Sequence, residues 1–204
     1  MTQVYCVSFE IAGPAAMFTR PDTGAAPVSY PAPTFSAARG MFEAVARWKS
    51  AYIRPTKVEI CAPIRFHKYV TNYRGPLRES SKRSSSYQLV ATVLVDVCYR
   101  VHGLVEGVTD APFDFNHLHA LQEVFLRRLE RGQCYHTPCL GWKEFVPSYF
   151  GSFRPETQVN EQLKMTPITV PSMLFSVFAG PGTNERKVEY RQSVEIREGV
   201  LIYA

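Results

Sequence analysis

The sequence predicts an α+β fold, in which antiparallel strands and a few helices share one compact domain with an appendage. The 204 residues are 46% hydrophobic and 20% charged, which is typical of a globular chain with a substantial core. Residues 4–11 and 87–101 carry the patterns of strands. Residues 35–51 and the segment after Asn116 carry apolar side chains at helical spacing.

The first half of the chain is expected to run from a strand through a long loop into a helix. Apolar residues occupy alternate positions of the strand at 4–11, and five prolines in residues 13–34 then predict an irregular loop. A loop of this length in a compact domain often has a function. Thr34 can cap the helix over residues 35–51. The charged residues expected on the outer side of this helix are Arg39, Glu43, Arg47 and Lys49.

The next elements complete a recognisable order. Strands at 57–66 and 87–101 are expected to pair as a hairpin through the residues between them. Asn116 is a good N-cap for a second helix, which should stop before Gly132. With a strand near 144–150, the order is that of the split β-α-β arrangement of ferredoxin-like and RRM-like folds.

These assignments divide the chain into two parts. Residues 1–151 are predicted to form a ferredoxin-like domain with a protruding basic β-hairpin at about 65–86. Residues 152–204 are predicted to form a C-terminal antiparallel β extension. Its strands are expected at 168–178, 188–196 and 200–203.

The hairpin segment at residues 64–83 has the composition of an RNA-gripping arm. Cations attract the phosphate backbone regardless of sequence, and aromatic faces stack on unpaired bases. A solvated basic hairpin without a ligand is the alternative interpretation. The cations are Arg65, Lys68, Arg74, Arg78, Lys82 and Arg83, interleaved with Phe66, His67, Tyr69 and Tyr73.

Net charge, apolar runs and the cysteines limit which partners, cellular location and metals can be expected. The net charge of +5 and the pI near 9.0 favour a polyanionic partner. The sequence shows no secretion signal and no apolar run long enough to span a membrane. Five cysteines, an odd number, suit reduced thiols in the cytoplasm. Cys134, His136 and Cys139 are too crowded for a tetrahedral zinc site and have no evident fourth ligand, so no metal is expected.

Several motifs in order carry a resemblance to one family. They run from residue 18 to residue 145 and comprise Phe18-Thr19-Arg20-Pro21, Val28-Ser29-Tyr30-Pro31, Ser36-Ala37-Ala38-Arg39-Gly40, Glu43-Ala44, Trp48-Lys49, Pro63-Ile64-Arg65-Phe66, Arg127-Arg128, Gly132-Gln133-Cys134-Tyr135-His136, Pro138-Cys139-Leu140-Gly141 and Glu144-Phe145. The ordered set resembles the Cas-five family of CRISPR-associated RAMP proteins, in its type I-C (Dvulg) branch.

The resemblance implies a fold, a function and partners. It implies a ferredoxin-like RAMP domain that holds the 5′ handle of CRISPR RNA (crRNA) within a Cascade complex. It also implies an endoribonuclease that cuts the repeat of precursor crRNA without a metal or other cofactor. The implied partners are precursor and mature crRNA and the backbone and large subunits of Cascade, and duplex DNA is a further candidate for the same basic face.

The family's catalytic groups are replaced in this chain. Arg47 stands where an aromatic residue or histidine is expected before Trp48, and an ungapped alignment puts Ala120-Leu121 in place of a Lys-His pair. If the helix begins one turn earlier, Asn116-His117 takes that place, with His119 nearby. The candidate catalytic groups are therefore His117 or His119 for proton transfer and Arg47 or Lys49 for stabilising charge. A structural subunit that binds the handle without cutting it is the alternative.

The remaining RNA-binding candidates lie outside the arm. Alternatives that need no ligand are packing of the long loop onto the domain and complementation of a helix dipole. The candidates are Phe18, Arg20 and Tyr30 in the proline-rich loop, Arg39 in the first helix, Arg127 and Arg128 in the second helix, and Gln133 and His136 in the loop after it.

Overall fold

The computed structural model describes residues 3–73, 87–108, 115–178, 180, 183 and 185–203, without the side chains of residues 71–73 and 87. The elements follow the chain in the order β1 (Cys6–Ala16), α1 (Phe35–Val45), β2 (Ala51–Ile60), β3 (Phe66–Tyr73), β4 (Tyr87–Gly107), α2 (His117–Glu130), β5 (Tyr149–Gly151), α3 (Glu161–Met165), β6 (Ile168–Phe178), β7 (Arg186–Arg197) and β8 (Val200–Ile202).

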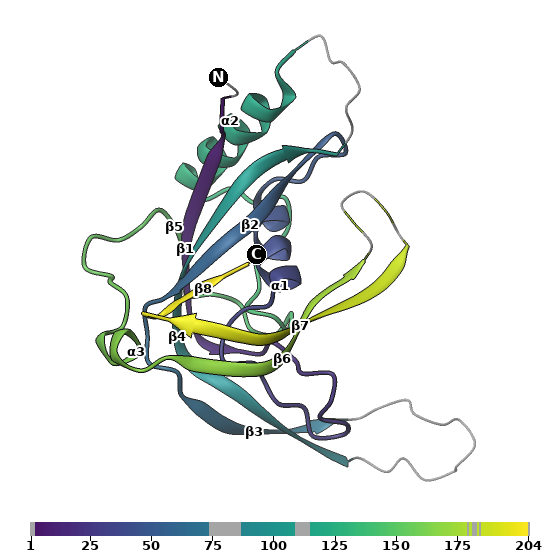
Figure 1. Ribbon diagram of the computed structural model, residues 1–204, viewed down its shortest axis with the longest axis vertical. Helices are drawn as coiled ribbons and strands as arrows, with labels where there is room; N and C mark the ends of the chain where they lie inside the picture. The colour runs from purple at the N-terminus through teal and green to yellow at the C-terminus, as the bar shows by residue number, and fades with distance from the viewer. Residues whose placement is uncertain are drawn as a thin grey trace.

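Within the described part of the chain, the strands belong to one eight-stranded sheet in the order β5-β1-β4-β2-β8-β7-β6, with β3 paired to β4 (Figure 1). Neighbouring strands are antiparallel throughout. The predicted α+β class is therefore confirmed.

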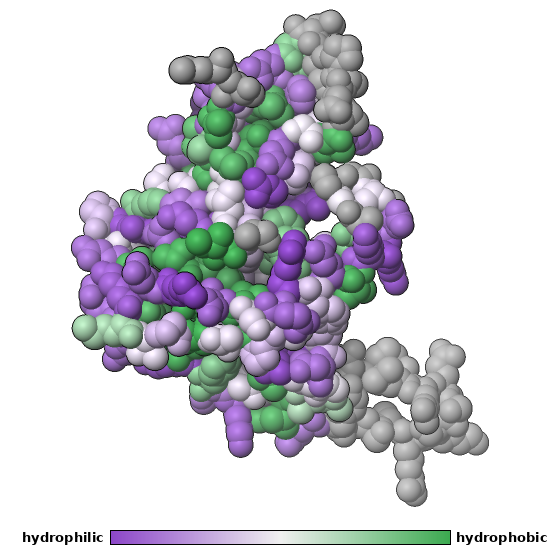
Figure 2. All heavy atoms as spheres, in the orientation of Figure 1, coloured by the Kyte–Doolittle hydropathy of each residue, from purple (hydrophilic) through white to green (hydrophobic). Residues whose placement is uncertain are grey.

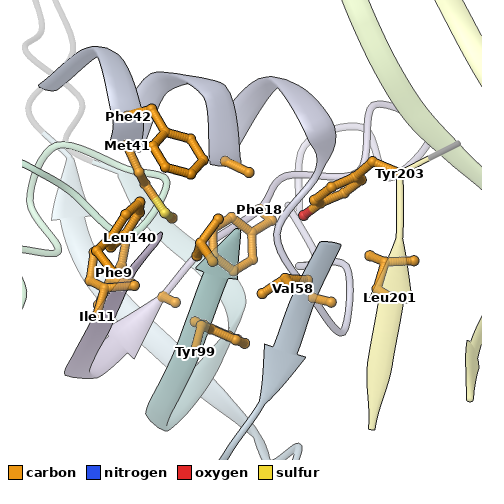
Figure 3. Packing of buried hydrophobic residues seen from close by; sticks show 14 of the residues in the cluster. Phe9, Ile11, Phe18, Met41, Phe42, Val58, Tyr99, Leu140, Leu201 and Tyr203 are labelled. Atoms are coloured by element: carbon orange, nitrogen blue, oxygen red, sulfur yellow. The ribbon is translucent and has the colours of Figure 1, made fainter. Parts of the chain in front are cut away.

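Both long helices cover the same face of the sheet. Phe9 of β1 lies 4.9 Å from Phe42 of α1 and 6.3 Å from Phe125 of α2, between ring centroids. All three side chains are fully buried. Figure 3 shows Phe42 and Met41 of α1 over Phe9 and Ile11 of β1. Burying these apolar side chains under the helices is the main stabilising contribution on this face.

The next residue of β1 points to the opposite face and carries a buried charge. Glu10 is fully buried, and its Oε1 accepts a hydrogen bond from Arg154 Nε at 2.6 Å. Arg100 Nε donates to Oε2 at 3.3 Å, and the Thr157 hydroxyl donates to Oε1 at 2.9 Å. Burial raises the pKa of this carboxyl, but the hydrogen bonds outweigh it and hold the pKa below its ordinary value. These hydrogen bonds connect Arg154 and Thr157, in the irregular segment after β5, to the sheet.

The hairpin is built on the longest strand. Residues 87–94 of β4 pair with β3, from Phe66 opposite Leu94 to Tyr73 opposite Tyr87, and the remainder of β4 lies between β1 and β2. The sequence predicted one strand over 57–66, whereas β2 ends at Ile60 and β3 begins at Phe66. Pro55 hid the start of β2, because proline disfavours strand interiors. It is tolerated at a register shift, beyond the short pairing with β8.

The first helix was predicted too long and the second correctly. Helix α1 begins after the N-cap Thr34 as expected, but it ends at Val45, and Ala46 is already extended. The apolar spacing through Trp48 misled the prediction, because β2 must start at Ala51 to pair with Gly107 of β4. Asn116 caps α2 as predicted, and Gly132 follows its end with a φ of 63°. The strand expected near 144–150 is shorter and later.

The first strand was predicted too early, since it extends to Ala16 and includes Pro14. The strands expected after residue 168 are all present. Strand β8 pairs with β2, so the predicted C-terminal extension continues the same sheet. Figure 2 shows polar residues over much of the face that bears β7, with apolar residues gathered beside β8. Among the described residues, no helix is long and apolar enough to cross a membrane.

Candidate nucleic-acid interface

Three of the predicted charged residues meet near the C-terminal end of α1. Arg39 Nε donates to Glu43 Oε1 at 2.7 Å, and Arg47 Nε lies 3.9 Å from the other carboxylate oxygen. Arg39 and Glu43 are one helical turn apart on α1, and Arg47 reaches the same carboxylate from the segment after the end of the helix. Arg47 has 64% of its side chain exposed, whereas Arg39 has 22%. Arg47 is therefore the arginine of this set that solvent or a ligand can reach.

These residues line a cleft along α1, called here the α1 cleft. Its first part, of about 260 Å³, lies against the β6–β7 hairpin at Ser176, Phe178 and Thr183. Its second part, of about 290 Å³, extends past Trp48 and Lys49 to Tyr52. Arg39, Glu43 and Arg47 border both parts. The structure thus places Arg39, predicted to bind RNA, beside Arg47 and Lys49, predicted as catalytic groups.

The floor of the second part is held by a network that the sequence did not indicate. The Tyr52 hydroxyl donates to Glu106 Oε2 at 2.6 Å, and Arg54 Nε donates to Oε1 at 2.6 Å. Burial and the neighbouring Glu106 raise the pKa of Tyr52 to about 12. The Arg39 guanidinium lies 5.7 Å from the Tyr52 ring centroid. Tyr52 is therefore a neutral hydrogen-bond donor at neutral pH, and it orders the base of the cleft.

The two candidate histidines lie on the first turn of α2. Asn116 caps this turn by accepting from the His119 amide, and its side chain donates to the Tyr5 hydroxyl at 2.6 Å. The His119 ring is 5.7 Å from the Tyr5 ring and 3.8 Å from Glu123 Oε1. His117 is half-buried, and His119 is exposed.

The residues lining the α1 cleft do not include either histidine. In Figure 1 the beginning of α2 lies near the top of the molecule, and α1 lies nearer its middle. The α2 residue that reaches the end of α1 is Arg128, whose Nη1 donates to the Val45 carbonyl at 2.7 Å. Arg128 is eleven positions after His117, about 16 Å along a helix. The two halves of the predicted catalytic set therefore belong to different parts of the surface.

The residues after α2 cap the end of α1. The amides of Tyr135 and His136 both donate to the Ala44 carbonyl, at 2.8 and 3.1 Å. Arg128 adds a cation to this helix C-terminus, which the helix dipole favours. Arg128 thus has a structural contact with the end of α1. Arg127, Gln133 and His136 are exposed, and His136 Nδ1 lies 3.3 Å from the Thr137 carbonyl.

Two RNA contacts predicted in the proline-rich loop are wrong. Phe18 is 3% exposed and Tyr30 is 2% exposed, so both rings belong to the core and are not available to stack on RNA. The Tyr30 amide donates to the Phe18 carbonyl, and the Tyr30 hydroxyl accepts from the Leu174 amide. Arg20 is on the surface, where its guanidinium makes two hydrogen bonds to Asp22.

The described part of the hairpin exposes the cations predicted there. Arg65 lies 3.2 Å from Asp96, with both side chains more than half exposed, and His67 and Lys68 are exposed. The side chain of Tyr73 and the residues Arg74, Arg78, Lys82 and Arg83 lie outside the described part of the chain.

Sequence reasoning missed an aromatic hollow at the base of the hairpin. This hollow, called here the hairpin-base pocket, has a volume of about 600 Å³. The rings of Trp142 and Phe145 stack at 5.9 Å with an interplanar angle of 9°, and Tyr69 meets Phe145 edge-on at 5.8 Å. The residues next to Trp142 in the sequence did not predict this pocket, because Tyr69 and Leu89 of its lining come from a distant hairpin. The pocket is lined by Tyr69, Leu89, Gly141, Trp142, Lys143, Glu144 and Phe145.

Metal ligands do not gather in the part of the chain that the structure describes, where no three of the histidine, cysteine, aspartate and glutamate residues form a group. Cys134 is exposed and Cys139 is half-buried. Burial raises the pKa of both thiols.

The fold is shared with solved CRISPR-associated proteins. A crystal structure of a CRISPR-associated protein superposes with a TM-score of 0.72 over 100% of this chain and 95% of its own, at 19% identity. A chain of a CRISPR RNA-guided surveillance complex superposes with a TM-score of 0.54 over 95% of this chain and 89% of its own, at 15% identity. At these identities the similarity concerns the fold.

Sequence comparison gives the family. Residues 6–196 match the family described as CRISPR-associated protein (Cas_Cas5). The chain is 34% identical over 162 residues to the CRISPR pre-crRNA endoribonuclease Cas5d of Mannheimia succiniciproducens, covering 71% of each chain. It is also 34% identical to the protein of the same name from Thermus thermophilus, over 68% of this chain and 60% of the relative. The chain belongs to the Cas5 family, as the sequence motifs indicated.

Proposed function

We propose that this protein is a Cascade subunit of a type I CRISPR system, in the type I-C branch, and that it binds the 5′ handle of crRNA and cuts precursor crRNA within the repeat. The observation that carries the proposal is the 34% identity to two relatives named as pre-crRNA endoribonucleases. The family match over residues 6–196 supports it along almost the whole chain.

The proposal extends to the fold, which we take to be a ferredoxin-like RAMP domain. The elements β1, α1, β2, β4, α2 and β5 follow the β-α-β-β-α-β order of that fold. Their strands lie side by side as β5-β1-β4-β2, and both helices pack on one face. On this basis residues 1–151 are the RAMP domain, and residues 152–204 supply the C-terminal strands.

RNA binding is assigned first to the α1 cleft. Arg47 and Lys49 are exposed beside it, and Arg39 lies deeper, paired with Glu43. Exposed cations attract phosphates without regard to sequence, and Trp48 offers a ring beside them. The exposed cations of the hairpin, Arg65 and Lys68, would extend the path of the backbone.

The proposed reaction needs few groups. The 2′-hydroxyl of the ribose attacks the adjacent phosphorus, the bond to the 5′-oxygen breaks, and the products are a 2′,3′-cyclic phosphate and a 5′-hydroxyl. A histidine, His117 or His119, would take the proton from the 2′-hydroxyl, and the 5′-oxygen gains a proton as it leaves. Arg47 or Lys49 would stabilise the charge of the phosphorane.

A second candidate function is handle binding without cleavage. The observation that favours it is the position of the histidines at the start of α2, where His119 contacts Tyr5 and Glu123 and neither histidine lines the α1 cleft. General-base catalysis requires the base within hydrogen-bond reach of the proton it removes. Cleavage therefore requires RNA that reaches both elements at once.

The partners follow from the same proposal. They are precursor and mature crRNA and the other Cascade subunits, in the cytoplasm, and duplex DNA is a further candidate ligand of the basic surface. The family resemblance implies a reaction without metal.

The test is cleavage of end-labelled repeat RNA by the purified protein in EDTA. We expect one discrete cut, abolished when the 2′-hydroxyl at the cut is replaced by hydrogen. Either His117→Ala or His119→Ala should slow cleavage by at least about 100-fold, because general acid–base catalysis contributes that much. Lys164→Ala is the surface control, because Lys164 is exposed and its ammonium pairs with Glu161 of the same short helix, in the C-terminal part of the chain.

Two other results would revise the proposal. Tight binding of repeat RNA that stays intact would leave the handle-binding function and remove the nuclease. Failure to bind repeat RNA at low salt would overturn the proposed function as a whole.

A further inference from the structure

We infer that the hairpin-base pocket receives an unpaired nucleobase of the bound RNA, stacked against Trp142 and Tyr69. This inference rests on the proposed RNA-binding function and assigns that function a second site, away from the α1 cleft. The pocket combines rings from β3 and from the segment at 141–145, which lie more than seventy positions apart in the sequence.

The pocket is held in place from several sides. The Leu140 amide donates to the Phe145 carbonyl at 2.8 Å, and the Phe145 amide donates to the Trp142 carbonyl at 3.0 Å. The Trp142 Nε1 donates to the Thr19 hydroxyl at 2.9 Å, which fixes the plane of the indole. Rings that are already ordered lose little conformational entropy when a ligand stacks on them.

Gly141 shows how closely this segment packs. Its φ is 92°, and a Cβ on it would lie 1.9 Å from the Met17 carbonyl oxygen. The Met17 amide in turn donates to the Leu140 carbonyl at 2.9 Å. The segment that carries Trp142 is therefore seated against the start of the proline-rich loop, and the pocket is built into the fold rather than formed by a freely moving loop.

The lining suits a flat aromatic ligand with polar edges. Phe145 is 9% exposed and forms the inner wall, whereas Tyr69 is 36% exposed and Trp142 is half-buried, so both keep ring surface open. Lys143 and Glu144 are exposed at the rim. A lysine can meet a phosphate, and a carboxylate can accept from the amino group of a base. The volume of about 600 Å³ is in the range of small-ligand sites.

The surroundings indicate a nucleic acid as the occupant. Lys143 lies at the rim of the pocket, and the hairpin that carries Tyr69 exposes Arg65 at its base. Proteins that bind single-stranded RNA combine such cations along the backbone with rings on which bases stack. An apolar side chain of a neighbouring protein is the competing occupant, and it would not need the nearby cations.

The two tryptophans allow both sites to be observed separately. Trp48 lines the α1 cleft and Trp142 lines the hairpin-base pocket, and the chain has no third tryptophan. In a Trp48→Phe variant, the remaining fluorescence reports on the pocket. In a Trp142→Phe variant, it reports on the cleft. We expect repeat RNA to quench the fluorescence of the Trp48→Phe protein, because a stacked base quenches an indole.

Affinity measurements complete the experiment. Trp142→Ala should weaken binding of repeat RNA about tenfold or more, while Trp142→Phe keeps a ring and should stay within about threefold. Tyr190→Ala is the matched control, since it removes a ring of β7 that is 43% exposed and lines neither the pocket nor the α1 cleft, and it should leave the affinity unchanged. Tyr69→Leu is the second stacking variant and is used if Trp142→Ala does not fold. RNA with one abasic nucleotide at the stacked position should bind the natural protein more weakly than intact RNA does. The Trp142→Ala variant should bind the abasic and the intact RNA equally well, because the stacking contact is already lost.

Other outcomes separate this inference from the proposed function. If repeat RNA binds tightly but no abasic position couples to Trp142 and the fluorescence of the Trp48→Phe protein is not quenched, the pocket does not hold a base and the inference is wrong. If repeat RNA does not bind to the natural protein at all, the proposed function fails and the inference fails with it.

Discussion

The α1 cleft and the hairpin-base pocket are two hollows of different chemistry on the same molecule. The cleft is bordered by Arg39, Arg47 and Lys49, with one carboxylate between the arginines. The pocket is walled by the rings of Tyr69, Trp142 and Phe145 and has one lysine and one glutamate at its rim. The cations of the cleft come from residues 39–49, whereas the rings of the pocket come from β3 and from residues 142–145.

The difference teaches that one RNA ligand would be held in two physically distinct ways. Attraction between cations and phosphates weakens steeply as salt rises, because counterions are released on binding. Stacking on rings depends little on salt. Salt dependence and ring substitution therefore measure the two regions independently.

The largest expected effect is a loss of stability at Gly141, where the hairpin-base pocket joins the core. Gly141→Ala should lower the free energy of unfolding by about 3 kcal/mol, because the added Cβ meets a backbone oxygen at a φ that strains L-residues. Gly132→Ala is the matched control, since Gly132 also has a positive φ but has nothing within 4 Å of its Cβ position. It should cost about 1 kcal/mol. Urea unfolding measures both, and equal losses would contradict the described packing of residues 141–145.

Charge reversal in the α1 cleft should affect binding almost as strongly. Arg47→Glu with Lys49→Glu should weaken binding of repeat RNA about 100-fold at low salt and flatten the plot of log affinity against log salt by about 1.4. Lys164→Glu with Arg197→Glu makes the same change in net charge on exposed residues of the C-terminal part and is the control. Equal weakening by both pairs would mean that net charge, and not the cleft, attracts the RNA.

The opposite face of the sheet offers a stability change that leaves both hollows intact. Glu10→Gln should lower the free energy of unfolding by about 2 kcal/mol at pH 7, because two arginines lose a charged acceptor. RNA affinity of the folded variant should stay unchanged.

The same carboxyl gives a pH dependence. Since its folded-state pKa is lowered, its contribution to stability is present above the unfolded pKa of about 4.3 and is lost as the pH falls through the folded pKa. The difference between the natural protein and Glu10→Gln should therefore shrink towards acid pH in chemical unfolding. A difference that grew in acid would contradict the arginine contacts.

The smallest expected effect is a gain in stability from a substitution at Gly40. Gly40 is exposed inside α1, and a Cβ there would meet nothing within 4 Å. Gly40→Ala should raise the free energy of unfolding by about 0.7 kcal/mol, because glycine is a poor helix former. Gly40 also borders the α1 cleft. Unchanged RNA affinity in this more stable variant would indicate that the backbone of RNA does not approach α1 at this point.

Much of the fold could be predicted because its signals are local. The N-caps at Thr34 and Asn116, the stop at Gly132 and the strand over 168–178 depend on neighbouring residues and were all found in place. The ends of α1 and β2 could not be predicted, since pairing with β4 overrides the helical spacing after Val45 and the proline at 55. The spacing of apolar residues does not show whether a segment will join a helix or a neighbouring strand.

The sequence by itself determined the α+β class, the family and the cations Arg39, Arg47 and Lys49, because periodicity, ordered motifs and charge can be read along the chain. Only the tertiary structure decided that Phe18 and Tyr30 are core residues, that the histidines of α2 stand apart from the α1 cleft, and that Trp142 shares a pocket with Tyr69. The physical reason is that exposure and contact between distant segments depend on strand order and helix packing. A residue type limits what a side chain can do, and the packing around it decides whether it is available to do it.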